Sequence, residues 1–184
     1  MNYYGAKDLA DSFRTVRKNT IIIAEEIGEE HYGFRPTAEA RTIAQTLVHI
    51  SNGSKFQEHI HGTLKLKALE GFDFPGFFMP IMAEEQKPHT KLEILTALNE
   101  QGNHFAHWLE SLSDEFLSER VSMAAGMTPP NKTRFEMILG VKEHEMHHRA
   151  QLMLMGRMVG IVPHMTREMN ARMAAMMAQS KASA

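Results

Sequence analysis

The sequence predicts an all-α protein, a four-helix bundle with an additional C-terminal helix. Apolar residues recur at helical spacing in several long segments, and no stretch shows the sustained alternation of a β-strand. Two threonine capping boxes also indicate where helices begin. No internal repeat or linker divides the 184 residues. We therefore expect a single domain over 1–184, with the bundle at about 6–160 and an amphipathic helix at about 165–179.

Capping and breaking residues give the boundaries of the bundle helices. The signals are a glycine stop, the two capping boxes at Thr42 and Thr90, and a proline-rich break. The predicted bundle helices are 6–28, 42–61, 90–112 and 132–159. Residues 69–88 are rich in glycine, proline and phenylalanine, and we expect a structured loop there. Its aromatics, Phe72 to Phe78, are expected to pack down or to line the mouth of a pocket.

The C-terminal segment carries a stripe of methionine. Ten of the 15 methionines fall from Met137 onward. Further upstream, we expect a short extra turn at 113–115, between the third and fourth helices. The stripe on the last helix consists of Met165, Met169, Met173 and Met176. Spacings of four, four and three place these side chains on one face. We expect this face to serve packing or a homodimer seam, because flexible thioethers suit adaptable interfaces.

Composition excludes several classes of function. The net charge is −2 with basic residues scattered along the chain. Neither nucleic acid nor an anionic membrane is therefore an expected partner. There is no cysteine, so disulfides and thiolate ligands are excluded, and any thiol must come from a cofactor. The first residues lack the apolar core of a signal peptide, and no apolar run could span a bilayer. We expect a cytoplasmic protein.

The last bundle helix places two histidines in its inward stripe. This stripe consists of Met137, Val141, His144, His148, Leu152, Met155 and Val159. His144 and His148 lie one turn apart on the same face, so both can direct a ring nitrogen at one metal ion. His147 lies on a more polar neighbouring stripe. A third ligand is expected, and His49 is the best donor because it sits mid-helix between apolar turns.

A plainer interpretation is that these histidines are core polar groups held by hydrogen bonds. Six further histidines, at loops, helix ends or polar faces, are expected to be solvated. They are His59, His61, His89, His104, His107 and His164.

The same residues match the zinc-protease pattern His144-Glu145-x-x-His148, in which the glutamate activates water. Metzincins would need glycine and histidine at positions that are Gln151 and Leu154 here. Zinc proteases usually hold an extended substrate against a strand, and none is predicted, so we disfavour this interpretation. Because Glu145 is rotated by about 100° from His144, we expect it to orient a neighbour rather than act as a base.

Two motifs resemble the DinB-like (YfiT/DinB) superfamily of metal-binding four-helix-bundle proteins. One is the run Leu-Val-His49-Ile in the second helix. The other is the run from His144 to Leu152, followed by Arg157 to Pro163. Helix order and length agree over most of the chain. Ala150 stands where the family commonly has glycine, a departure that should not disturb a metal.

The resemblance implies a metal triad at His49, His144 and His148, the set that the inward stripe also favours. It further implies a divalent ion, zinc or nickel, and a homodimer. Some relatives look like enzymes that use low-molecular-weight thiols, and others have been labelled hydrolases. The expected function is therefore that of a thiol S-transferase-like or hydrolytic enzyme acting on a small molecule.

The alternative is a non-catalytic metal-binding or stress-associated interaction protein that uses its Met-rich helix. An accessible pocket beside the histidines would favour the enzyme. A sealed site with a fourth protein ligand would favour the structural role. Arg149 could pair with a carboxylate in a structural role or contact an anionic substrate, and we favour the structural role.

Overall fold

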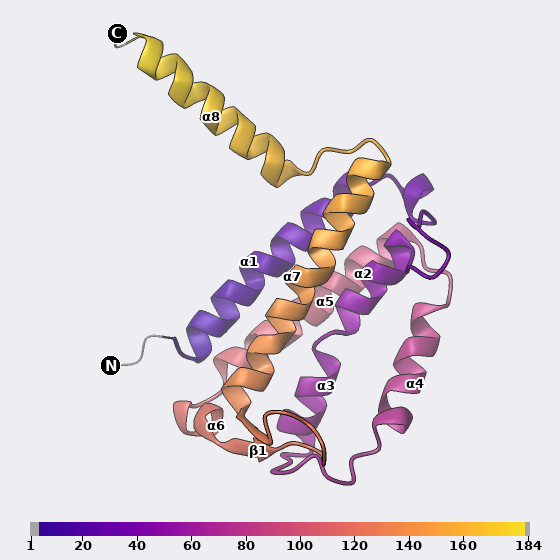
Figure 1. Cartoon of the computed structure of the whole chain (residues 1–184), viewed down its shortest axis with the longest axis vertical. Coiled ribbons are helices and arrows are strands. Elements are labelled where there is room, and N and C mark those ends of the chain that lie inside the picture. Colours follow the sequence, from indigo (N-terminus) through magenta and orange to yellow (C-terminus); the bar gives the residue numbers. More distant parts are fainter. Residues whose placement is uncertain (1–3, 183–184) are drawn as a thin grey trace.

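Four helices form the bundle of the computed structural model, which describes residues 4–182 (Figure 1). They are α1 (Ala6–Glu26), α2 (Ile43–Asn52), α5 (Lys91–Glu110) and α7 (Arg134–Met158). α1 and α2 each pack against both α5 and α7. The all-α prediction is confirmed, and the predicted starts and ends of the first, third and fourth helices agree with the structure within two residues.

Hydrogen bonds at the helix starts explain these boundaries. The predicted capping boxes are present, and the Gln45 amide donates to Thr42 Oγ1 at 3.1 Å. A third box begins α7, where the Glu136 amide donates to Thr133 Oγ1 at 3.1 Å. The Glu136 carboxylate in turn accepts the Thr133 amide at 2.6 Å. Each box satisfies backbone amides that have no partner inside the helix.

The second predicted helix, 42–61, is divided in the structure. α2 ends at Asn52, and a short α3 (Lys55–Gln57) then leads into the π-helix η2 (Glu58–Thr63). The division falls at Gly53, where an added Cβ would lie 3.2 Å from the Ile50 carbonyl oxygen and 3.3 Å from His144 Nδ1. The backbone changes path where it passes close to α7.

The prediction of a loop over 69–88 is wrong, because most of this segment is a helix, α4 (Phe74–Glu85). The Asp73 side chain caps the first turn, and Pro75 lies in that turn, where the missing N–H costs no hydrogen bond. Pro80 lies inside the helix. Glycine and proline concealed α4 because both residues disfavour a helix interior.

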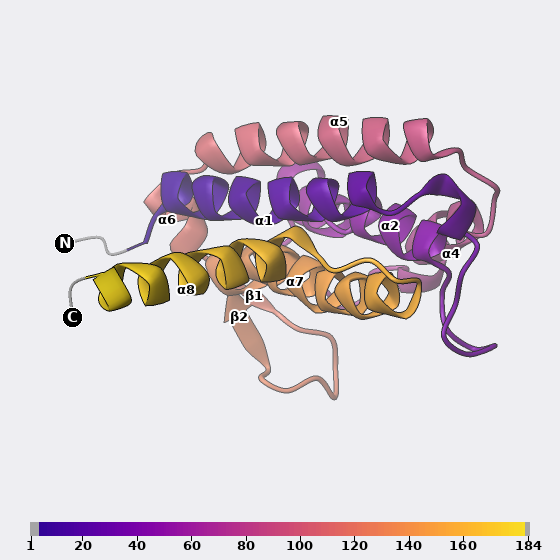
Figure 2. The same ribbon diagram turned by 90° about the horizontal axis from the view of Figure 1, so that it is seen from above.

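A short antiparallel pair of β-strands lies between α5 and α7 in the sequence. α6 (Asp114–Ser118) matches the expected extra turn, and it leads to β1 (Arg120–Ser122), which pairs with β2 (Asn131–Thr133). Strands of three residues are too short to show alternation in a sequence. The segment that joins them projects beyond α7, on the side away from α5 (Figure 2).

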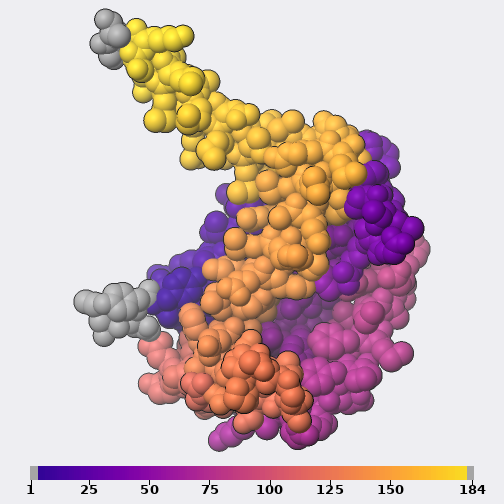
Figure 3. All heavy atoms as spheres, in the orientation of Figure 1, coloured from indigo at the N-terminus to yellow at the C-terminus, as the bar shows by residue number. Residues whose placement is uncertain are grey.

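The C-terminal helix predicted at about 165–179 is present as α8 (His164–Ala182), and it extends away from the bundle (Figures 1 and 3). Its base is held by Arg167, which bonds the Glu26 carboxylate. The methionine stripe is exposed, with 64% of Met169 and 50% of Met173 accessible. Within residues 4–182, no helix is both long and apolar enough to cross a membrane.

Candidate metal centre

Three histidines from two helices converge between α2 and α7. His49 Nε2 lies 2.9 Å from His144 Nε2, and His148 Nε2 lies 3.1 Å from the same atom. One ring nitrogen from each of the three lies within 4.8 Å of the others. The structure therefore brings together the three side chains that the sequence selected. His147 is exposed, as its polar stripe predicts.

The geometry of these nitrogens suits one shared cation better than hydrogen bonds. An imidazole nitrogen carries either one N–H or one lone pair, so His144 Nε2 cannot form a good hydrogen bond with both neighbours. In a tetrahedral zinc site with Zn–N bonds of about 2.0–2.1 Å, ligand nitrogens are about 3.3 Å apart. Two of the three separations, 2.9 and 3.1 Å, are close to that value, and all three ligand atoms lie within 4.8 Å of one another, so the residues fit a metal ion.

The opposite nitrogens of two rings are held by polar partners. His49 Nδ1 lies 2.6 Å from Glu85 Oε1, and His148 Nδ1 donates to Gln151 Oε1 at 2.8 Å. The other Glu85 oxygen accepts a hydrogen bond from Arg41 Nε at 3.0 Å. A proton on each Nδ1 leaves the Nε2 lone pair directed at the centre of the cluster. Such outer contacts fix the tautomer and the orientation of metal-binding histidines.

Burial keeps the cluster in the charge state that a metal requires. It lowers the pKa of His144 to about 4, assisted by the neighbouring His148 and His49, and it also lowers the pKa of His148. Both rings are therefore neutral at pH 7. Burial alone would raise the pKa of Glu85, but its bond with His49 and the charge of Arg41 outweigh burial and lower it.

Sequence reasoning missed Glu85 and Arg41. Glu85 lies in the last turn of α4, inside the region predicted to be a loop, and only 3% of it is exposed. A carboxylate in a last helical turn is unfavourable for the helix dipole. An unfavourably placed carboxylate can indicate a special role, but this indication was usable only if α4 had first been predicted as a helix.

Glu145 does not face the histidines, so the zinc-protease interpretation fails. Its carboxylate is buried and pairs with Arg17 of α1, whose Nε donates to both oxygens, at 3.0 and 3.1 Å. Arg17 also donates to the Leu98 carbonyl at 2.7 Å. The expectation that Glu145 orients a neighbour is confirmed. Burial lowers the pKa of Arg149 and the charge of Glu145 opposes this effect, while the structural role of Arg149 stays a prediction.

Two of the histidines expected to be solvated are buried instead. His61 has no exposed surface and accepts a hydrogen bond from Arg134 Nη1 at 2.7 Å. His164 is 6% exposed, and its Nε2 donates to Asn19 Oδ1 at 3.1 Å. Both lie near an element boundary, where the sequence gives no periodicity from which to infer burial.

Two cavities meet at the cluster. One of about 530 Å³ is lined by His49, His144, Phe74 and Phe78, so part of the predicted aromatic segment does line a pocket. Phe72 and Phe77 pack on Phe56 at the same wall, with centroid distances of 5.7 and 5.6 Å.

The other cavity, of about 630 Å³, is lined by His148 and Gln151. Arg41, Met82 and Glu85 line both cavities. The cluster is therefore open to ligands from two directions.

The fold and the cluster define a helical-bundle protein with three histidines that can hold a metal ion. The model of the DinB superfamily matches residues 12–152, so this chain belongs to that superfamily. The match ends before α8. The comparison with curated proteins gives no match.

Two solved structures from Bacillus subtilis share the fold. The DinB-like protein YjoA is 19% identical, with a TM-score of 0.60 over 83% of this chain and 91% of that one. YfiT is 14% identical, with a TM-score of 0.64 over 85% of this chain and 88% of that one. YfiT is described as a probable metal-dependent hydrolase with an unusual four-helix bundle topology. At these identities the likeness establishes the fold alone.

Proposed function

We propose that this chain is a metal-dependent enzyme that acts on a small molecule. His49, His144 and His148 would hold a divalent ion, zinc or nickel. The observation that carries the proposal is the convergence of three Nε2 atoms beside an open cavity. A divalent ion supplies Lewis acidity, which favours the deprotonated form of water or of a low-molecular-weight thiol.

The surrounding residues support a reactive site over a sealed structural one. Within residues 4–182, the group of close ligand atoms comprises these three histidines, and three protein ligands leave a coordination position open. Glu85 holds the proton of His49 Nδ1, and Arg41 neutralises the buried Glu85 carboxylate. These contacts keep the His49 ring in place while a substrate enters and leaves.

The nucleophile would be either water or a thiol cosubstrate, since the chain has no cysteine. The description of YfiT as a probable metal-dependent hydrolase supports water. Two cavities that meet at the cluster support a reaction with two separate reactants, as a thiol transferase requires. Steady-state assays with ester substrates, in the presence and absence of thiols, separate these reactions.

The test of the metal site is elemental mass spectrometry on tag-free protein. We expect about one equivalent of zinc or nickel in the wild type and none in His144→Ala/His148→Ala. The matched control is His104→Ala/His107→Ala, which removes two histidines from the surface of α5 and should keep the metal. A folded wild type that carries no metal and gains none on reconstitution would overturn the proposal, leaving the histidines as core polar groups.

A second candidate function rests on α8. We propose that its exposed methionine stripe forms a homodimer seam, because an isolated amphipathic helix gains most of its stability from packing. Met169→Glu/Met173→Glu in the full chain should convert a dimer to a monomer in sedimentation equilibrium. A wild type that is already monomeric would contradict the seam. It would leave the stripe free for another partner, as the alternative of an interaction protein requires.

A further inference from the structure

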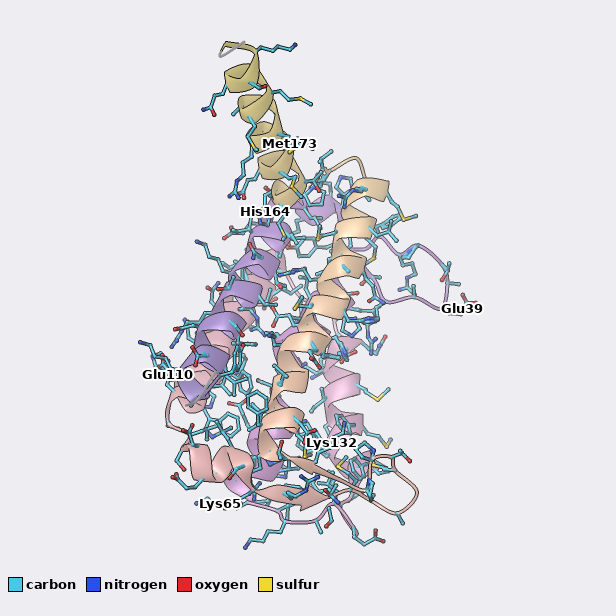
Figure 4. All side chains as sticks on the ribbon, turned by 60° about the vertical axis from the view of Figure 1, so that its left-hand side comes forward. Glu39, Lys65, Glu110, Lys132, His164 and Met173 are labelled. Carbon is cyan, nitrogen blue, oxygen red and sulfur yellow. The ribbon has the colours of Figure 1, made fainter. Side chains whose placement is uncertain are left out.

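The cavity beside His49 and His144 is a trough that follows one face of α7. Its lining on that helix comprises Glu136, Met137, Gly140, Val141, Glu143 and His144. At 1.5 Å per residue, Glu136 and His144 are about 12 Å apart along the helix. Lys132 of β2 also lines the cavity, and it lies near the N-terminal end of α7 (Figure 4). The trough is therefore elongated, with the histidine cluster at one end.

The facing wall of the trough is mostly apolar, and its polar members are the amide side chains of Asn52 and Gln57. It is built by α3, α4 and the segment between β1 and β2, and includes Phe56, Phe74, Phe78, Ile81, Met123 and Met127. The centroid of the Phe56 ring lies 5.2 Å from that of Phe78 and 5.9 Å from that of Phe74, so the aromatic part of the wall is continuous. The methionines can adapt to the shape of what they contact.

Charged groups of the trough are confined to its ends and rim. At the histidine end, Arg41 and Glu85 neutralise each other. At the far end, the Glu136 carboxylate is held by the Thr133 amide and hydroxyl. Glu143 is exposed on α7. The middle of the trough thus offers no charged partner to a ligand, whereas its walls offer apolar surface.

Gly140 keeps the middle of the trough open. Glycine inside a helix is less favourable than alanine, so its presence in α7 needs a reason. A Cβ on Gly140 would meet nothing within 4 Å. Gly102 of α5 differs, because a Cβ there would lie 2.9 Å from Arg17 Cγ. Close packing explains Gly102, but it does not explain Gly140, whose missing side chain only enlarges the cavity.

We propose that the substrate of the histidine site has an elongated apolar body that lies in this trough, against Gly140 and the phenylalanine rings. Its polar reacting group lies at the His49 and His144 end. This inference rests on the proposed function, which makes the histidine cluster the place where the substrate reacts. A volume of about 530 Å³ lies within the range of small-molecule sites, which are mostly apolar with a few polar groups.

The test is calorimetric titration of zinc-loaded protein with two ligand series. One series is the n-alkyl hydroxamates from acetohydroxamate to octanohydroxamate, which carry a metal-chelating head. The other is the matched n-alkyl amides, which lack it. Each methylene buried in the trough should lower Kd by about three- to fourfold in both series. The hydroxamates should bind more tightly than the amides at every chain length.

Gly140→Leu places a side chain in the open space of the trough. We expect it to remove the gain with chain length while acetohydroxamate affinity stays within about twofold. Gly140→Ala should fold with an unchanged or higher Tm, which shows that α7 tolerates a side chain at this position. Gly33→Leu is the matched control, because Gly33 also has nothing within 4 Å of its Cβ position and is exposed outside the trough. It should retain the wild-type chain-length dependence.

The two series separate this inference from the proposed metal site. A chain-length gain in both series with no hydroxamate advantage would support the trough and contradict the metal. A hydroxamate advantage that does not grow with chain length would overturn the trough and leave the metal proposal intact. A chain-length gain that persists in Gly140→Leu would also overturn the trough, because the alkyl chain would then be binding elsewhere.

Discussion

The Glu85 carboxylate on α4 lies 2.6 Å from His49 Nδ1 on α2, and this contact ties the cavity wall to the histidine cluster. Arg41 holds the other Glu85 oxygen at 3.0 Å, so the carboxylate is fixed at both ends. The helix that supplies the phenylalanine rings thereby also supplies the group that orients a proposed metal ligand.

Glu85→Gln should weaken metal binding by about 10- to 100-fold, as is usual when a polar partner of a ligand histidine is lost. The amide is a weaker acceptor than the carboxylate, so the His49 ring is less well oriented and less basic. Competition with a chelator of known affinity measures the change. Glu84→Gln is the matched control, because Glu84 pairs with Lys87 outside both cavities. Equal affinity in the wild type and Glu85→Gln would contradict the role of this contact.

The histidine cluster was predictable because it depends on helical periodicity, which a sequence displays directly. His144 and His148 share a stripe with apolar residues, and the structure packs α7 against α1 and α2. His49 followed from its position between apolar turns. In each case the local pattern and the packing agree.

The rest of the site was not predictable from local patterns. Glu85 is 36 residues from His49 in the sequence, and it reaches the cluster only because α4 folds back along α2. The first turn of α4 contains Pro75 and Gly76, residues whose helical preference is poor until the Asp73 cap and the aromatic wall compensate. The burial of His61 similarly depends on Arg134, which is distant in the sequence.

His61 should make folding sensitive to acid. Burial, assisted by the charge of Arg134, lowers its pKa in the folded protein from 6.5 to about 4. Between these values the unfolded chain binds the proton and the folded protein does not. The contribution of neutral His61 to the free energy of unfolding is therefore complete above pH 6.5. It falls by on the order of 2–3 kcal/mol as the pH is lowered toward 4.

His61→Asn should flatten this dependence, because the asparagine oxygen can still accept the Arg134 hydrogen bond but does not titrate in this range. Urea unfolding of the metal-free protein at pH 7 and pH 4.5 measures the difference. The control is His107→Asn, which changes an exposed histidine of α5. An unchanged pH slope in His61→Asn would show that His61 does not contribute to it.

Glu145→Gln should lower stability by about 3–5 kcal/mol, because it leaves the Arg17 guanidinium buried without a charged partner. It should leave the metal content unchanged, since Glu145 faces α1 and not the histidines. A zinc-protease glutamate would give the reverse result, with normal stability and lost activity. Urea unfolding together with elemental analysis separates these outcomes. The double variant Arg17→Met/Glu145→Leu should recover much of the loss, because it removes both buried charges.

Gly53→Ala should disturb the cluster by displacing the His144 ring. The new Cβ would lie 3.3 Å from His144 Nδ1 and 3.2 Å from the Ile50 carbonyl oxygen, both tighter than ordinary contacts. The imidazole is the more mobile of the two neighbours, so it should shift away from the shared centre and weaken metal binding by about tenfold. Chelator competition measures this change.

Gly156→Ala is the matched control for Gly53→Ala. Gly156 lies in α7, and an added Cβ there would make its nearest contact at 3.7 Å, an ordinary van der Waals distance. It should leave metal affinity unchanged and should not reduce stability, since alanine favours a helix. If both alanine variants bound metal as tightly as the wild type, the division of the second helix at Gly53 would have no role in placing His144. Loss of affinity in Gly53→Ala alone would show that the break after α2 leaves room for the His144 ring.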